Sequence, residues 1–240
     1  MENHKEKNRE PSMDDTFIRV LSHQLKAPIN AIRSLLNTIS DGFTGESNQK
    51  TIHFIERASV RAIEAEDMIS DLLDYQLYSQ EPSALDKEFG LTAMLNSLLN
   101  KYNSIASEKD VFLHSDIPPK QAIYVFGDER SLFQATRNII ENAVKYTATG
   151  GDIKVSLRIT EKKQTCMIEI TDDGQGIAAD ELPHIFEPFY RSIKHKTNIA
   201  GTGLGLSIAK QVVDHHRGTL TVESKENAGT TFRLLCPIPG

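Results

Sequence analysis

The sequence has few cysteines, no long apolar run and no excess of positive charge. Cys166 and Cys236 form neither a metal-binding nor a redox pair, so we expect buried thiols in a reducing compartment. No apolar run approaches the roughly 18 residues of a membrane span, and the polar N-terminus lacks a signal-peptide core. These absences predict a cytoplasmic chain or the cytoplasmic part of a longer, membrane-bound protein. With 27 Lys and Arg against 33 Asp and Glu, we expect neither nucleic acid nor direct membrane contact as a partner.

Two N-terminal stretches carry apolar residues at alternating steps of three and four. After a polar linker of residues 1–13, one helix is predicted to about residue 40 and a second from about 49 to 79, with the turn S-D-G-F-T-G-E-S-N between them. A lone hairpin of this kind leaves an apolar seam uncovered, so we expect a homodimer that closes a four-helix bundle. A monomeric hairpin packed on the following domain is the alternative.

His23 lies off the apolar seam, on the most exposed side of the first predicted helix. An exposed imidazole has a pKa of about 6.5 and is a nucleophile at neutral pH. Pro28 removes a helical hydrogen bond, and its ring collides with the carbonyl of Gln24, so the helix should be bent or loosened beside His23. An ordinary surface histidine is the competing interpretation.

Residues 85–240 mix strands and helices without strict alternation, and E-P-S-A-L-D marks the boundary with the hairpin of residues 14–80. This mixture predicts an α+β domain with its helices on one face of a sheet. Helices are expected over 91–107, 129–146 and 204–216, and strands over 111–115, 124–126, 153–159, 167–171, 219–224 and 230–235.

Four stretches of this domain carry residues suited to a nucleotide. In N-I-I-E-N-A-V-K-Y, Asn138, Asn142 and Lys145 or Tyr146 share one helix face, where amide oxygens suit Mg²⁺, lysine suits phosphate and tyrosine can cover a base. In T-D-D-G-Q-G-I, Asp172 can accept a hydrogen bond from an exocyclic amine. Each of these patterns taken alone also fits an ordinary polar surface or turn.

The other two stretches are H-I-F-E-P-F-Y-R, which ends in the guanidinium of Arg191, and G-T-G-L-G-L-S, which precedes a helix. Three glycines before a helix N-terminus present N–H groups to an anion, so the latter predicts a phosphate cradle. The polar span between them, S-I-K-H-K-T-N-I-A, is suited to a mobile lid over the nucleotide.

In this order the motifs resemble those of the sensor histidine kinases of two-component signalling. S-H-Q-L-K-A-P resembles the phosphoacceptor box of that family, and the four stretches resemble its asparagine, first glycine, phenylalanine and second glycine boxes, with G-T-T-F as the closing motif. The resemblance covers residues 14–240. It implies a dimeric phosphotransfer hairpin followed by an α/β-sandwich ATP-binding domain of the type shared with gyrase and the mismatch-repair ATPases.

The resemblance also assigns roles to individual residues. It implies His23 as the phosphoacceptor, Asn142 as the principal Mg²⁺ ligand with Asn138 supporting it, Lys145 as a phosphate contact, Asp172 as the adenine-amine acceptor and Arg191 as a γ-phosphate contact. The remaining ATP-binding positions that it implies are Tyr146, Gly174, Gly176, Ile177, Gly201, Thr202, Gly203, Leu204, Gly205, Leu206 and Thr230.

Asn138 separates two reactions within this superfamily. The related ATPases have a glutamate at that position as the base that activates water, and an amide cannot take a proton from water. The prediction is therefore autophosphorylation of His23 by Mg-ATP and transfer to an aspartate of a response regulator, rather than hydrolysis. A hydrolytic ATPase and a nucleotide-binding scaffold without catalysis are the alternatives.

Two positions depart from the usual pattern of the family. Many members have an acidic residue after the histidine, where this chain has Gln24, which can orient the imidazole but cannot accept its proton. We therefore expect slow autophosphorylation. Members that dephosphorylate their partner usually have Thr or Asn four residues after the histidine, and Ala27 at that position predicts weak phosphatase activity.

Overall fold

The computed structural model describes residues 27–39, 41, 48–78, 87–118, 122–160, 165–192 and 201–238. The chain divides into two compact units, Met1–Asp71 with Ala200–Thr202, and Leu72–Ile199 with Gly203–Gly240. We call them the helical unit and the catalytic unit. None of the helices in these described ranges combines the length and the apolar character that a membrane span needs.

Both helices that the periodicity predicts contribute to the helical unit, although the second continues beyond Asp71 into the catalytic unit. Residues 27–39 are helical, and α2 (Asn48–Tyr78) confirms the second predicted helix within one residue at each end. The small residues Ala58 and Ala65 are buried, whereas Ile52 and Ile63 are 50% and 56% exposed. The helices thus cover only part of their own apolar surface.

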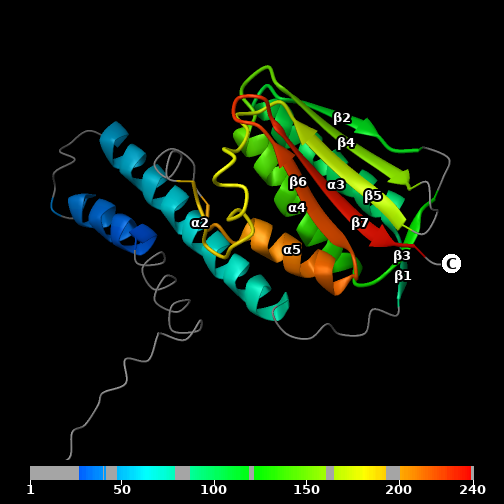
Figure 1. Ribbon diagram of the computed structural model, residues 1–240. Coiled ribbons are helices and arrows are strands. Elements are labelled where there is room, and N and C mark those ends of the chain that lie inside the picture. Colours follow the sequence, from blue (N-terminus) through cyan, green and yellow to red (C-terminus); the bar gives the residue numbers. More distant parts are fainter. Residues whose placement is uncertain are drawn as a thin grey trace, which may run out of the picture. The chain divides into compact units, whose positions relative to one another are not determined.

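The catalytic unit is built on a five-stranded sheet in the order β2-β4-β5-β7-β6. The β2–β4 pair is parallel and the other pairs are antiparallel. Three helices cover one face of the sheet (Figure 1), which confirms the expected α+β arrangement. The elements are α3 (Leu91–Glu108), β2 (Phe112–Asp116), α4 (Glu129–Tyr146), β4 (Asp152–Ile159), β5 (Thr165–Asp172), α5 (Gly205–His215), β6 (Thr219–Ser224) and β7 (Thr230–Pro237).

A second, two-stranded sheet joins β1 (Glu88–Gly90) to β3 (Tyr124–Phe126). The sequence predicted β3 but not β1, because a strand of three residues is too short to show a two-residue period. Both strands flank α3, whose first amide, that of Leu91, donates to the carbonyl of Ile123 over 2.8 Å.

The core of the catalytic unit lies between the sheet and its helices. Every second side chain of β5 is buried, from Cys166 to Asp172, as expected for a strand with one covered face. Tyr78, in the last turn of α2, is only 8% exposed and belongs to the same core. Both cysteines are free and buried, as the sequence predicted.

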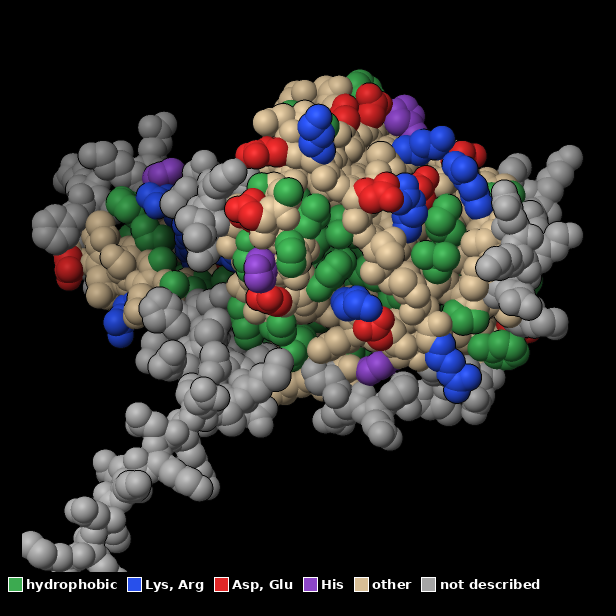
Figure 2. Space-filling view, in the orientation of Figure 1, with side chains coloured by type: hydrophobic (Ala, Val, Ile, Leu, Met, Phe, Trp, Pro, Cys, Tyr) green, Lys and Arg blue, Asp and Glu red, His purple; other side chains and the backbone are tan. Residues whose placement is uncertain are grey.

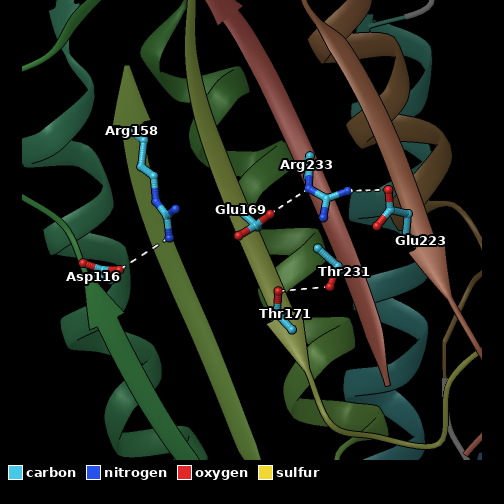
Figure 3. A network of polar contacts seen from close by, with 7 residues as sticks. All are labelled: Asp116, Arg158, Glu169, Thr171, Glu223, Thr231 and Arg233. Atoms are coloured by element: carbon cyan, nitrogen blue, oxygen red, sulfur yellow. Dashed lines mark hydrogen bonds and ion pairs between the residues drawn. The ribbon is translucent and has the colours of Figure 1, made fainter. Parts of the chain in front are cut away.

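The opposite face of the sheet is polar. Arg233 on β7 lies between Glu169 on β5 and Glu223 on β6, with a nitrogen-to-oxygen distance of 2.7 Å to each, and Arg158 on β4 pairs with Asp116 on β2 (Figure 3). The space-filling view shows positive and negative side chains interspersed over this side of the molecule (Figure 2). Because cross-strand ion pairs occupy this face, the sheet is stable with helices on its other face alone.

Candidate functional site

Helix α4 carries the first group of predicted residues. Asp128 caps the helix, since its carboxylate accepts hydrogen bonds from the amides of Arg130 and Ser131. Asn138 is buried, and its Nδ2 donates to the carbonyl of Gly205 over 3.0 Å. Because the amide nitrogen is held by this carbonyl, the amide oxygen is the atom that can serve a cation.

The C-terminal end of α4 brings together an amide, two cations and an aromatic ring. Asn142, Lys145 and Tyr146 are partly buried there, and the ammonium of Lys145 lies 5.9 Å from the centre of the Tyr146 ring. Burial raises the pKa of the Tyr146 hydroxyl, and the positive charge of Arg191 offsets part of that rise. The γ-phosphate contact expected of Arg191 remains a prediction.

Asp172 lies at the end of β5 and is only 7% exposed. Its carboxylate accepts a hydrogen bond from the amide of Gly174 over 3.0 Å and another from the backbone of Thr230. Burial raises the pKa of this carboxyl to about 6, and the two backbone donors counteract only part of the effect. A buried carboxylate with this environment is suited to accept a hydrogen bond from a ligand amine.

The loop after Asp172 lies so close to its neighbours that two positions require glycine. A Cβ atom on Gly174 would come within 2.5 Å of the carbonyl oxygen of Tyr146. Gly176 has a φ of +68°, and a Cβ there would lie 2.0 Å from the carbonyl oxygen of Lys225. The first glycine stretch thus packs between the end of α4 and the turn that joins β6 to β7.

The second glycine stretch leads into α5 and contacts the phenylalanine stretch. The carbonyl of Gly203 accepts a hydrogen bond from the amide of Phe189 over 2.9 Å, and Leu204 is buried. The side chain of Leu204, the N-cap residue of α5, makes no capping hydrogen bond, and the first backbone N–H groups of a helix form the positive end of its dipole. This arrangement suits a phosphate chain.

Some predicted residues are not placed with this site. Gly201 and Thr202 fall in the helical unit, where the Thr202 hydroxyl donates to the carboxylate of Asp71 over 2.6 Å. His23 and Gln24 lie outside the described residues, as do residues 193–200 of the lid predicted over 192–200. Their roles remain predictions.

The donors at this site fit Mg²⁺ bound together with a nucleotide. Among the residues that the structure describes, no group of three or more His, Cys, Asp or Glu side chains is placed to hold a metal ion. A cation beside α4 would therefore take its ligands from amide oxygens, water and nucleotide phosphates, which Mg²⁺ accepts readily.

The sequence analysis did not identify Ser224, at the end of β6, as a residue of this site. Its hydroxyl oxygen lies 2.8 Å from the amide nitrogen of Ile177 and 2.9 Å from Oγ1 of Thr230. The only available signal was its position directly before the predicted hairpin turn, and many strands end in a serine without such a role.

Comparison with known families and structures gives consistent results for both units. Residues 13–80 match the family described as His Kinase A (phospho-acceptor) domain, and residues 127–240 match the family described as histidine kinase-, DNA gyrase B-, and HSP90-like ATPase. The heme sensor protein HssS of Staphylococcus saprophyticus is 34% identical over 222 residues, which are 92% of this chain and 46% of HssS. The chain thus spans less than half of that relative's length.

Two solved structures extend the comparison. The mycobacterial sensor histidine kinase MprB is 29% identical with a TM-score of 0.55, over 64% of this chain and 97% of that one. Histidine kinase ThkA, in complex with response regulator protein TrrA, has a TM-score of 0.72 at 18% identity, over 93% of this chain and 61% of that one. At that identity the second likeness supports the fold alone.

Proposed function

The chain belongs to the histidine kinases of two-component signalling, and from this membership we propose that it phosphorylates its own His23 from Mg-ATP and passes the phosphoryl group to an aspartate of a response regulator. The observation that carries the proposal is that Asn138, Asp172 and the N-terminal end of α5, which follows the second glycine stretch, belong to one compact unit. Asn142 would hold Mg²⁺, which would supply positive charge beside the phosphate groups of ATP.

The residues of the catalytic unit hold the nucleotide in two places. Asp172 accepts a hydrogen bond from the adenine amine, while Tyr146 covers the base. The start of α5, Lys145 and Arg191 bind the phosphate oxygens. An imidazole nitrogen of His23 then attacks the γ-phosphorus in line, the new P–N bond forms as the bond to the β-phosphate oxygen breaks, and ADP leaves.

Asn138 favours this transfer over hydrolysis. Its Nδ2 is engaged by the carbonyl of Gly205, and neither atom of an amide can remove a proton from water. An enzyme with this residue at this position lacks the general base that a hydrolytic ATPase requires there. The imidazole supplies the nucleophile without such a base, because it carries a lone pair at neutral pH.

We also propose that the functional state is a homodimer joined through the helical unit. Large apolar side chains of α2, such as Ile52, Ile55 and Ile63, are half exposed in the single chain. A second copy provides the matching surface, since the same stripe on both chains is self-complementary about a two-fold axis. A response regulator is the further partner that we propose, because the chain belongs to the histidine kinases of two-component signalling.

The cytoplasm is the proposed location, because the proposed phosphoryl donor is ATP. HssS is named as a heme sensor, and about half of its length lies outside the match.

Incubation of the full chain with γ-labelled ATP and Mg²⁺, beside a His23→Ala control, tests the kinase. We expect label that is stable in alkali and labile in acid, and that is lost in the variant. Label that persists in His23→Ala would reject His23 as the acceptor. ATP binding without any label would favour the alternative of a nucleotide-binding scaffold without catalysis. Gln24 is the feature of the sequence that favours this alternative, so Gln24→Glu would then be the variant to test.

A further inference from the structure

The hydroxyl of Ser224 makes three short polar contacts at the point where the first glycine stretch meets the β6–β7 hairpin. Its Oγ lies 2.8 Å from the amide nitrogen of Ile177, 2.8 Å from the carbonyl oxygen of Gly229 and 2.9 Å from Oγ1 of Thr230. Ser224 is only partly buried, but Thr230 is 7% exposed. One hydroxyl therefore joins the loop, the turn and a residue that the sequence assigned to the nucleotide.

The donor and acceptor roles in this cluster follow from the chemistry of each group. The amide of Ile177 can only donate, and the carbonyl of Gly229 can only accept. A hydroxyl has a single proton, so Ser224 donates it to Gly229 and accepts from Ile177. The contact with Thr230 is then favourable only if Thr230 donates its own proton to Ser224.

This assignment fixes the polarity of Thr230. With its proton directed at Ser224, the Thr230 hydroxyl presents only lone pairs to any other partner. Thr230 pairs with Asp172 across β5 and β7, and its backbone amide donates to the Asp172 carboxylate. Two hydrogen-bond acceptors, the carboxylate and the Thr230 hydroxyl, thus lie side by side at the base end of the proposed site.

We infer that Ser224 is a positioning residue that makes the chain select a purine with a 6-amino group over one with a 6-oxo group. An exocyclic amine has two N–H donors for the two acceptors. A 6-oxo purine presents a carbonyl oxygen at the same position, and that oxygen needs a hydrogen-bond donor. Thr230 cannot be this donor while its hydroxyl proton is donated to Ser224. The inference rests on the proposed function, because it presumes that Asp172 and Thr230 bind the base.

The loop contacts of Ser224 give a second, separable effect. The amide of Asn227 donates to the carbonyl of Gln175 over 2.6 Å, so the loop keeps one attachment to the turn when Ser224 is removed. Loss of the Ile177 contact lowers the affinity for every nucleotide by the same factor, whatever its base. Only the contact through Thr230 changes the ratio between bases.

The test is titration calorimetry of the full chain with ATP, with ITP as the 6-oxo analogue, and with purine riboside triphosphate, which has hydrogen at that position. We expect Ser224→Ala to weaken all three and to lower the ATP-to-ITP affinity ratio by about fivefold, the value of one hydrogen bond of average strength. Ser224→Thr keeps the hydroxyl and should keep the wild-type ratio. An unchanged ratio in Ser224→Ala would overturn the inference.

Thr230→Val provides a matched control that does not depend on Ser224. It removes the hydroxyl at nearly constant volume, so the ATP-to-ITP ratio should fall, and adding Ser224→Ala in that background should leave the ratio where it is. A further fall in the double variant would show that Ser224 acts by another route and would also overturn the inference. If the wild-type chain binds no ATP, the proposed function itself fails, which is a different result.

Discussion

The two units of this chain bury their apolar side chains to very different extents. In the catalytic unit Leu157, Ile168 and Leu234 are fully buried between the sheet and its helices. In the helical unit Ile52 and Ile63 remain half exposed, although both units consist of regular elements with clear apolar periods. Periodicity therefore predicts the elements equally well in both, but only the catalytic unit contains the surfaces that cover them.

Of the changes proposed here, a cavity in the core of the catalytic unit should change the free energy of unfolding the most. Leu157→Ala removes a side chain with no exposed surface, so we expect the free energy of unfolding of the catalytic unit to fall by about 3 kcal/mol. Urea denaturation of the full chain measures it. Ile63→Ala is the control. If it lowered the free energy of unfolding by a comparable amount in the same transition, the two units would not differ in how far they bury their apolar side chains.

Replacing Asp172, the buried carboxyl of the proposed site, should instead stabilise the catalytic unit. A carboxyl with a pKa of about 6 when folded, against 3.8 in the unfolded chain, binds its proton more tightly in the folded state. The folded state therefore loses stability as the pH rises from about 4 to 6, and this loss is complete at pH 7. Asp172→Asn should thus raise the free energy of unfolding by about 2 kcal/mol at pH 7.

The gain should shrink at pH 4.5, where the carboxyl of the folded wild type is mostly protonated, and urea titrations at the two pH values measure the difference. ATP affinity should fall in the same variant, because an amide is a weaker acceptor for the adenine amine than a carboxylate. A variant that is stabilised equally at both pH values would argue against ionisation as the cause.

A charge in the exposed apolar stripe of α2 should weaken dimerisation. Ile63→Asp places a charge where a second copy is proposed to pack, and we expect the dimer dissociation constant to rise by about tenfold or more. Sedimentation equilibrium measures it, with Glu66→Ala on the same helix as the control. ATP affinity should stay unchanged, because the proposed nucleotide residues Asn138 and Asp172 belong to the other unit. Dimerisation that is indifferent to the charge would place the interface elsewhere.

The smallest effect should come from the polar face of the sheet. Glu223 is 72% exposed and Glu169 22% exposed, yet both pair with Arg233 at the same distance. Glu223→Gln should change the free energy of unfolding by less than about 0.5 kcal/mol, because solvent screens an exposed pair. Glu169→Gln should cost more in the same urea titration. Equal costs would mean that burial does not set the strength of these pairs.

Sequence reasoning located most elements of the catalytic unit. It predicted a helix over 129–146 and a strand over 219–224, and the structure confirms both as α4 and β6. The ligand contacts that it proposed remain predictions. The phosphoacceptor role of His23 stays a prediction, since that residue lies outside the described ranges.

The contacts that sequence reasoning missed join residues far apart in the chain. Asn138 donates to Gly205, and Ser224 accepts from Ile177. Each such contact involves one side chain and one backbone group, and no period or spacing in the sequence encodes a pairing of that kind. The two-residue and seven-residue periods encode only which side of an element is apolar.

The pairing of β5 with β7 has a consequence for the order in which the protein becomes active during synthesis. Asp172 leaves the ribosome before Thr230, because the chain is made from its N-terminus, and the two residues meet only when β7 enters the sheet between β5 and β6. A nascent chain that has all three helices of the catalytic unit still has only Asp172 of the two residues that we propose to bind the base. ATP binding should therefore begin only after β7 has been made and paired, so a half-synthesised chain should be unable to send a signal.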